Sequence, residues 1–202
     1  SLFGVMGIDL PAPDHTTLSR RGQHLDLILC RVAPGDGMRL IVDSTGLSMA
    51  GEGEWAAAKH GTCGRRGWKK LHLAVDRSGV IIAQTLTEAN VDDAITGIDL
   101  IERVNGDLAS VTADAAYDTL AFYDAAGVRG ATVVVPPTRT AKVSRRRPRS
   151  SARDRTIKRV KAIGRRRWKK ESGYHAQARV ENAFCRYKSI IGDGLRARSP
   201  GG

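Results

Sequence analysis

The hydrophobic and polar positions of this chain change their period several times, which is the pattern of a protein that mixes strands and helices. Residues 39–48, 68–76 and 80–87 contain short apolar runs, and these predict three consecutive strands. The sequence Arg77-Ser78-Gly79 between the last two predicts a hairpin turn, because glycine adopts the backbone angles that tight turns require. Asp76 is expected to be a residue of the same turn.

After residue 90 the chain alternates between helical and extended patterns. A helix is predicted from Asp92 or Asp93 to about residue 104, a strand over 110–114, a helix over 118–126, a strand over 131–136 and a closing helix over 174–191. Three strands followed by helix, strand, helix, strand and helix is the element order of a ribonuclease H-like fold, a mixed α/β sheet with flanking helices. The order alone also fits other α/β folds.

The amino-terminal part of the chain differs from the rest. Residues 14–29 predict a helix that Asp14 could cap, and the turn Pro34-Gly35-Asp36-Gly37 separates it from the first strand. We therefore divide the chain into an amino-terminal helical connector, residues 1–36, and one α/β domain, residues 37–202.

Positive charge is concentrated in one segment of the chain. Of the 33 Lys and Arg residues, 16 lie in residues 137–170 together with a single acid, Asp154, whereas the rest of the chain has 17 basic and 20 acidic residues. A near-neutral body with one basic insertion is typical of a protein that binds a polyanion, and nucleic acid is the preferred candidate. A solvated loop without a partner is the alternative. Trp168 and the apolar spacing of Ile157, Val160 and Ile163 indicate that part of the insertion folds.

Composition argues against several other classes of protein. The sequence has no run of about 18 apolar residues that would span a membrane, and its start lacks the basic and apolar regions of a signal peptide. The three cysteines, Cys30, Cys63 and Cys185, are odd in number and widely spaced. This usage favours reduced thiols in a cytoplasm over a disulfide framework or a zinc site. We therefore expect a cytoplasmic protein with no membrane partner.

Three carboxylates occupy settings that suit metal binding. Asp43 lies within the first predicted strand, Asp114 ends the fourth, and Glu181 lies inside the last helix. In a sheet of ribonuclease H-like order the first and fourth strands are neighbours, and the last helix packs across them. We therefore predict that the three carboxylates converge to within about 8 Å, where they would hold hard divalent cations such as Mg²⁺.

The residues around these acids resemble a known family. The resemblance is to the DDE domain of bacterial insertion-sequence transposases, specifically the insertion sequence five group, and it rests on Asp43 in VDST, Asp114 in ADAAYD and the residues Tyr174, Glu181 and Lys188. The third-acid motif of that family is Tyr, two residues, Arg, three residues, Glu, six residues, Lys. This chain departs from the motif at Gln177, where the family has Arg, although Arg179 lies close by. Family members usually extend beyond both ends of this chain, so we expect it to be truncated at both ends.

The resemblance implies a DNA transposase that cuts and joins strands by two-metal phosphoryl transfer. One Mg²⁺ held by Asp43 and Asp114 would activate a water that cuts the end of the element, and a second held by Asp43 and Glu181 would stabilise the leaving 3′ oxygen. The freed 3′ hydroxyl would then attack target DNA, and Mn²⁺ should substitute for Mg²⁺. The implied partners are transposon ends and target DNA, with a homodimer assembled on the DNA in the bacterial cytoplasm, associated with the nucleoid.

The resemblance also implies residues that contact DNA. Positions 174, 181 and 188 are seven apart and would share one helix face, so Tyr174 and Lys188 would reach phosphates on either side of Glu181. The residues expected to contact DNA are Tyr174, Arg179, Lys188, Arg145, Arg146, Arg147, Arg149, Arg165, Arg166 and Arg167. Residues 1–36 would be the remnant of a DNA-contacting region.

Two alternative functions remain open from the sequence. The chain could be a catalytically inactive remnant that only binds DNA, which Gln177 and the missing ends favour, or a related ribonuclease H-like nuclease that shares the acids. Two local assignments are open as well. Asp118 either caps the following helix, which is the preferred interpretation, or supports the acids from behind. The glycine-rich residues 51–67 form either a plain loop or a DNA-contacting element.

Overall fold

The computed structural model of the protein describes residues 37–49, 68–144 and 151–195, and in addition Gly7, Thr16, Thr17 and Arg20. The three long ranges belong to one compact unit, Leu29–Leu195, and the four single residues belong to a second unit, Ser1–Ile28 with Arg196–Gly202. The predicted helix over 14–29, apart from its three described residues, and the predicted loop over 51–67 lie outside the described residues.

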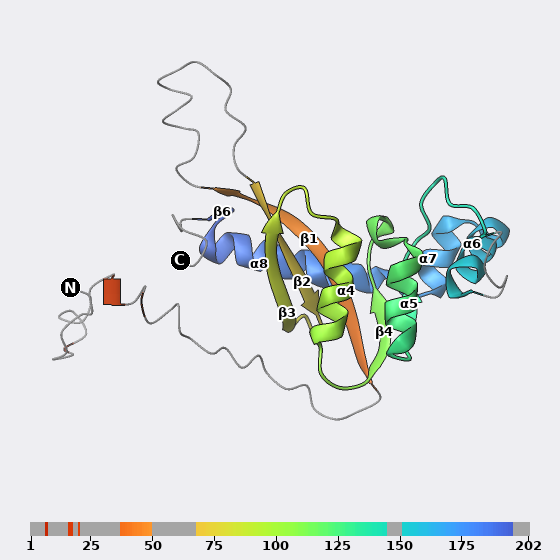
Figure 1. Ribbon diagram of the computed structural model, residues 1–202, viewed down its shortest axis with the longest axis horizontal. Helices are drawn as coiled ribbons and strands as arrows, with labels where there is room; N and C mark the ends of the chain where they lie inside the picture. Colours follow the sequence, from red (N-terminus) through yellow and green to blue (C-terminus); the bar gives the residue numbers. More distant parts are fainter. Residues whose placement is uncertain are drawn as a thin grey trace, which may run out of the picture. The chain divides into compact units, whose positions relative to one another are not determined.

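A mixed sheet forms the centre of the first unit (Figure 1). Its described strands are β1 (Met38–Met49), β2 (Trp68–Val75), β3 (Ile81–Glu88), β4 (Leu108–Thr112), β5 (Thr132–Val134) and β6 (Gly194–Leu195). Their spatial order is β3-β2-β1-β4-β5, with the short β6 paired to β1. Strands β1, β2 and β3 are antiparallel neighbours, whereas β4 and β6 run parallel to β1 and β5 runs parallel to β4. The predicted fold class, an α/β ribonuclease H-like sheet, is confirmed.

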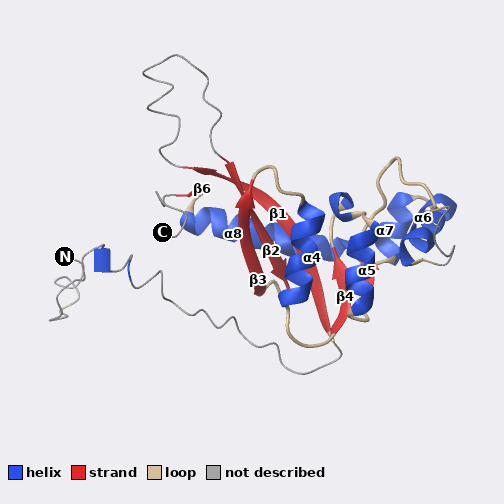
Figure 2. Cartoon of the chain, in the orientation of Figure 1, coloured by secondary structure: helices blue, strands red, loops and turns tan. Residues whose placement is uncertain are grey.

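Helices cover both faces of this sheet (Figures 1 and 2). On one face lie α4 (Asp93–Arg103) and α5 (Leu120–Val128), and on the other lies α8 (Ala178–Ile191), which packs against β1 and β2. Helices α6 (Ala152–Ile163) and α7 (Arg165–Glu171) pack on each other, and α6 also contacts α5. Two short 3₁₀ helices, η1 (Ala115–Tyr117) and η2 (Tyr174–Gln177), precede α5 and α8. No helix in the described ranges is long and apolar enough to cross a membrane.

The alternation of side chains along β1 divides the core into two layers. Leu40 and Val42 join the cluster beneath α4 and α5, whereas Ile41 and Leu47 join the cluster beneath α8. All four side chains are almost fully buried. Successive residues of a strand point to opposite faces, so the odd-numbered Asp43 belongs to the face that α8 covers. The face on which this acid lies is therefore set by the strand pattern.

Helix α4 begins where the sequence predicts. The Asp92 carboxylate accepts hydrogen bonds from the backbone N–H groups of Ala94 (2.8 Å) and Ile95 (3.1 Å), which satisfies two of the donors that a helix start leaves unpaired. Inside the helix, Gly97 makes room for the rings of Tyr117 and Phe122, because a Cβ at this position would come within 2.7 Å and 2.9 Å of them. The glycine lets helix α4 approach η1 closely.

The predicted hairpin after β2 is also present. The Asp76 carboxylate accepts hydrogen bonds from the N–H groups of Ser78 (2.8 Å) and Val80 (2.9 Å), as expected for a turn residue. Gly79 has φ +87°, a backbone angle that glycine adopts without strain.

Two details of the sequence prediction are wrong. Helix α5 is capped by Thr119, whose hydroxyl accepts from the Phe122 N–H at 3.2 Å, and not by Asp118, which turns toward other partners. The closing helix was expected to run from Tyr174, but the α-helix begins at Ala178, after a 3₁₀ turn that follows Gly173 at φ +72°. The tighter 3₁₀ turn changes the angular position of Tyr174 relative to Glu181.

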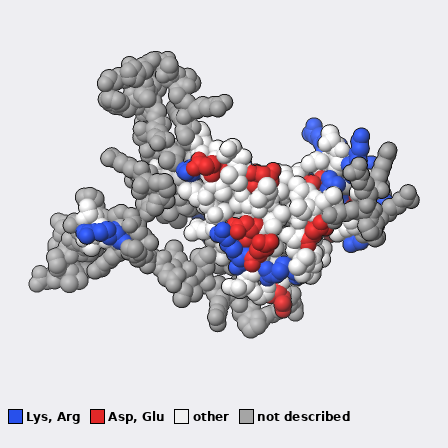
Figure 3. Space-filling view, viewed as in Figure 1, with Lys and Arg blue, Asp and Glu red and all other residues white. Residues whose placement is uncertain are grey.

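The described part of the basic insertion is folded, as Trp168 and the isoleucines indicated. Residues 152–171 form α6 and α7, with Ile157 2% exposed and Trp168 5% exposed. Lys and Arg side chains gather over these two helices, whereas positive and negative side chains are mixed over β3 and α4 (Figure 3). Arg145, Arg146, Arg147 and Arg149 lie outside the described residues. The interpretation of the whole insertion as an unstructured loop is therefore wrong for its second half.

Candidate active site

Asp43 lies in the middle of β1, on the face of the sheet that α8 covers. The backbone N–H of Ser44 donates a hydrogen bond of 2.8 Å to its Oδ1. Burial raises the pKa of Asp43 to about 6, and the charges of Asp114 and Glu181 act in the same direction, while the Ser44 N–H and the Gln177 side chain lower it. An acid whose ionisation is opposed by burial and by two other acids is suited to a cation, which would stabilise its charged form.

Asp114 follows the end of β4, the strand that neighbours β1. Strands β1 and β4 run parallel, and Ile41 opposite Thr112 is their last pair. Asp43 and Asp114 each follow two residues later, so the register places them at equivalent positions on neighbouring strands. Oδ1 of Asp114 accepts a hydrogen bond from the Ala116 N–H at 2.8 Å, which fixes the carboxylate at the start of η1. The parallel register explains why its charge acts on Asp43.

Glu181 is brought to these acids by helix α8. Val180, Ala183 and Phe184 are buried against β1 and β2 and hold this helix across the sheet. Glu181 follows Val180 in the first turn of the helix and is exposed. Its charge contributes to the raised pKa of Asp43, so the two carboxylates lie within electrostatic reach of each other.

Tyr174 lies within reach of all three acids. Burial raises the pKa of this phenol to about 12, and the charges of Asp114, Asp43 and Glu181 add to the effect, while Arg165 opposes it. The Nζ atom of Lys169 lies 4.6 Å from the centre of the Tyr174 ring, and the ring of Trp168 lies 6.3 Å from it. The phenol thus stays protonated and joins the acids to the basic helix α7.

The carboxylate oxygens of the three acids are chemically suited to a divalent cation, although their positions do not form a metal site. Among the described residues, no group of three or more His, Cys, Asp or Glu side chains has the geometry of a formed metal cluster. Asp43, Asp114 and Glu181 are nevertheless close enough to oppose one another's charge, and a bound cation would remove this repulsion. Carboxylate oxygens are also the ligands that hard cations prefer. Convergence of the three carboxylates to within about 8 Å stays a prediction.

Gln177, the departure from the third-acid motif, lies directly beside β1. Its side chain is 5% exposed, and its Nε2 donates to the carbonyl oxygen of Val42 at 3.4 Å. The same amide lowers the pKa of Asp43, whereas its buried Oε1 has no hydrogen-bond partner in the described part of the chain. Gln177 therefore ties the start of α8 to the strand that carries Asp43.

Two basic residues of α8 that were grouped in the sequence lie on different sides of the helix. Each residue turns an α-helix by about 100°. Lys188, seven residues after Glu181, is therefore about 20° away from it, whereas Arg179 is about 200° away. Arg179 lines a hollow together with Arg186, next to the β2–β3 turn. Lys188 can serve the same face as Glu181, but Arg179 cannot replace a cation at position 177.

The arginines of α7 divide into one inward and two outward side chains. The guanidinium of Arg165 donates to the carbonyl oxygen of Pro137 and its charge acts on Tyr174, so it lies on the side of the insertion that faces Tyr174. Arg166 and Arg167 are exposed. Their exposure leaves both guanidinium groups accessible to a polyanion.

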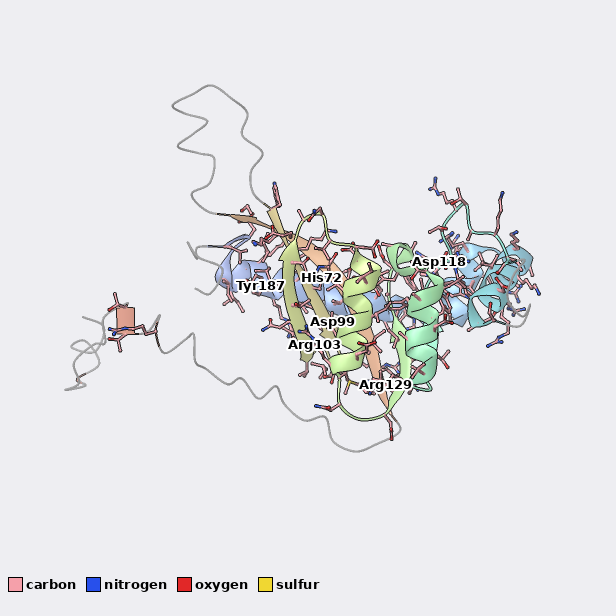
Figure 4. The ribbon with its side chains drawn as sticks, in the orientation of Figure 1. His72, Asp99, Arg103, Asp118, Arg129 and Tyr187 are labelled. Atoms are coloured by element: carbon pink, nitrogen blue, oxygen red, sulfur yellow. The ribbon has the colours of Figure 1, made fainter. Side chains whose placement is uncertain are left out.

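Asp118 forms an ion pair that the sequence did not reveal. Its buried carboxylate accepts hydrogen bonds from Nε and Nη2 of Arg153, at 2.7 and 3.0 Å, and from the Thr138 N–H at 2.9 Å. Figure 4 shows Asp118 between α5 and the pair α6–α7. The ion pair joins the core to the insertion across 35 residues, and no local pattern signals a partner at that separation. The only sequence signal that singled out Asp118 was its position four residues after Asp114 in ADAAYD.

His72 is a structural residue. Its side chain is fully buried on the α4 side of the sheet, where its Nε2 lies 2.8 Å from the Thr87 hydroxyl, and burial lowers the pKa of its ring. His72 is paired with Ser44 across β1 and β2, and so faces away from the side that carries Asp43.

Comparison with protein families agrees with this geometry. A family model described as "Transposase DDE domain" matches residues 34–201, and a second model with the same description matches residues 1–52. The first match includes β1, β4 and α8, and with them all three acids. Membership of this family implies DNA as a partner and dependence on divalent metal. The chain belongs to the transposase DDE domain family.

Proposed function

We propose that this protein is a DNA transposase that cleaves the ends of an insertion sequence and joins them to target DNA in a divalent-metal-dependent reaction. The observation that supports the proposal is the parallel register of β1 and β4, which brings Asp43 and Asp114 to adjacent positions on the strands that α8 crosses with Glu181. The charges of the three acids also contribute to the raised pKa of Tyr174. Three acids that are distant in the sequence and that would meet on one face of the sheet are an arrangement that suits metal-dependent phosphoryl transfer.

The acids would share two divalent cations. Asp43 and Asp114 would hold one ion, and Asp43 and Glu181 the other, with Mg²⁺ as the preferred ion and Mn²⁺ as a substitute. When bound, the ions supply charge stabilisation to the attacking and leaving oxygens of the phosphodiester. The protein fixes the carboxylates through hydrogen bonds from the backbone N–H groups of Ser44 and Ala116.

Two side chains would position the DNA strand at the acids. Tyr174 keeps its proton in the presence of three carboxylates and can donate a hydrogen bond to a phosphate oxygen. Lys188 lies on the same side of α8 as Glu181 and can pair with a second phosphate. Both side chains would align the substrate, and alignment supplies a large part of catalysis in phosphoryl transfer.

The basic helices would hold the DNA that approaches the acids. Arg166 and Arg167 are exposed on α7, which adjoins Tyr174 through Trp168 and Lys169. The reaction joins two transposon ends to one target, so we infer a homodimer assembled on DNA at the bacterial nucleoid. Phosphate contacts of this kind are independent of sequence and weaken as salt rises.

The test of this function is Asp114→Asn in the full chain. The variant should lose more than about a hundredfold of the Mg²⁺-dependent nicking of a labelled transposon end, because a metal ligand matters more than a residue that only orients one. The asparagine Oδ1 can still accept from the Ala116 N–H, which preserves η1. DNA binding at fixed salt should therefore remain.

Asp99→Asn is the matched control. It removes the same charge from the outer side of α4, where Asp99 pairs with Arg103, and should nick DNA as the parent does (Figure 4). Equal nicking by the parent and by Asp114→Asn would refute the role of Asp114.

One observation favours a second candidate function, an inactive remnant that binds DNA only. Gln177 is buried beside Asp43 where the family has an arginine, so this face lacks a cation that the motif provides. A parent protein that binds transposon ends but does not cleave them with Mg²⁺ or Mn²⁺ would support the remnant. Gln177→Arg would then be the first repair to test.

A further inference from the structure

A hollow of about 370 Å³ lies between helix α8 and the turn that joins β2 to β3. Its described lining residues are Ser78, Gly79, Arg179, Asn182, Cys185, Arg186 and Ser189. All except Gly79 are exposed, so the hollow opens to solvent. It is a surface site, and it takes most of its lining from a single helix.

The hollow is separate from the three acids. Arg179, Asn182, Arg186 and Ser189 follow one another at spacings of three and four residues and therefore share one side of α8. Around the helix axis Glu181 is about 200° from Arg179 and about 140° from Arg186, although Cys185, four residues after Glu181, is only about 40° from it. A ligand bound to the two guanidinium groups would therefore contact α8 on a side that faces away from Glu181.

The chemistry of the hollow is that of an anion site. Its described lining contains two guanidinium groups, one amide and two hydroxyls, and no carboxylate. Nη2 of Arg186 donates to the carbonyl oxygen of Gly79 at 2.8 Å, which holds this guanidinium against the turn. A Cβ at Gly79 would approach the same Nη2 atom to 3.4 Å. The glycine thus lets the turn and the arginine lie in contact.

Two other polar side chains of the hollow are available to a ligand, whereas the hydroxyls of Ser78 and Ser189 already donate to Oδ1 of Asp76 (2.6 Å) and to the carbonyl oxygen of Arg186 (3.0 Å). In the described part of the chain neither Arg179 nor Asn182 has a hydrogen-bond or ion-pair partner. Guanidinium groups present several N–H donors in a planar arrangement that matches phosphate oxygens, and the amide of Asn182 can add a further donor. An acidic peptide would use the same charge, so the test below compares DNA with polyglutamate.

We propose that this hollow binds a backbone phosphate of a DNA segment other than the one that reaches the three acids. The proposal rests on the proposed function, because a transposase must hold transposon-end DNA and target DNA at the same time. Helix α8 would then contact DNA on both sides: Glu181 and Lys188 face the reacting strand, and Arg179 and Arg186 face the second segment. Opposite sides of one rigid helix would fix the separation of the two segments.

The test uses Cys185 as a reporter in the full chain. Cys185 is exposed and lines the hollow. In a background with Cys30→Ser and Cys63→Ser, the rate of Cys185 alkylation by a maleimide is measured without metal, with and without a DNA duplex of arbitrary sequence. At saturating duplex, alkylation should slow at least about fivefold. Because Cys185 is four residues after Glu181, duplex at the acids could also shield it, so two variants locate the duplex. Arg179→Gln should remove the protection and lower the salt slope of duplex binding by about 1, whereas Lys188→Gln, on the side of Glu181, should leave the protection in place.

Arg103→Gln is the matched control, because it removes the same charge from α4 on the other face of the sheet. It should leave both the protection and the salt slope unchanged. An alkylation rate that duplex DNA does not alter would overturn the proposal, as would protection by polyglutamate in place of DNA. Neither measurement requires cleavage. A parent protein that does not nick DNA would therefore refute the proposed function, whereas the alkylation rate and the salt slope would still decide whether the hollow binds DNA.

Discussion

Neutralising Asp43 should stabilise the metal-free protein, although it removes a proposed ligand. Burial, with the charges of Asp114 and Glu181, raises the pKa of Asp43 from 3.8 to about 6. Each pKa unit corresponds to about 1.4 kcal/mol, so ionised Asp43 lowers the free energy of unfolding by at most about 3 kcal/mol. Solvent at this partly buried carboxylate screens its charge, which makes the value an upper limit. In Asp43→Asn the Oδ1 atom can still accept from the Ser44 N–H.

The effect has a defined dependence on pH. The pKa of Asp43 is higher in the folded protein than the ordinary value of 3.8, so the folded state binds this proton more tightly than the unfolded chain does. The destabilisation is absent below the unfolded pKa, grows between pH 3.8 and about 6, and is complete above the folded pKa. The asparagine variant has no such group. Its advantage in stability over the parent should therefore increase as pH rises through this window.

The assay is urea unfolding followed by far-ultraviolet circular dichroism, in EDTA, at several values between about pH 4.5 and about pH 8. Asp99→Asn, which removes an exposed charge of α4, is the control and should show no growing advantage. Added Mg²⁺ should stabilise the parent by mass action and stabilise Asp43→Asn less. A variant that is less stable than the parent at high pH, or an advantage that does not change with pH, would refute the reasoning.

The remaining predictions concern the insertion and its attachment to the core. Asp118→Ala should lower the free energy of unfolding by about 3–5 kcal/mol in urea, because it leaves the largely buried guanidinium of Arg153 unpaired; a loss below about 1 kcal/mol would contradict this role. Trp168→Ala should cost about 3–5 kcal/mol, since a side chain that is 5% exposed is removed, and an unchanged urea midpoint would contradict it. Replacing the four arginines at 145, 146, 147 and 149 with Ala should weaken binding to all DNA sequences alike and reduce its salt slope; an unchanged slope would show that they do not contact DNA.

Much of the fold could be predicted from the sequence because its signals are local. The alternation of Leu40, Ile41 and Val42 marks β1 and determines the face on which Asp43 lies, and the Asp92 cap marks the start of α4. Each of these signals acts over a few residues. The order of the elements then restricts the topology, because a ribonuclease H-like sheet places the first and fourth strands side by side.

The tertiary structure decided the features that depend on residues far apart in the chain. The partner of Asp118 is Arg153, 35 residues away, so a residue that a local pattern assigns to a helix cap instead joins the core to the insertion. The α-helix of α8 starts at Ala178 and not at Tyr174, and Gln177 packs against Val42 of β1. Arg179, close to Glu181 in the sequence, lies across the helix from it and faces the β2–β3 turn.

The candidate site follows the same division. The sequence by itself determined which residues are candidates, because Asp43, Asp114, Glu181 and the Tyr174 and Lys188 spacing form a recognisable motif. Only the fold determined how they act on one another. Burial in β1 raises the pKa of Asp43, and the charges of Asp114 and Glu181 add to this effect through the parallel register with β4 and the packing of α8. Periodicity and capping are short-range properties of the chain, whereas burial and charge depend on the elements that tertiary packing brings together.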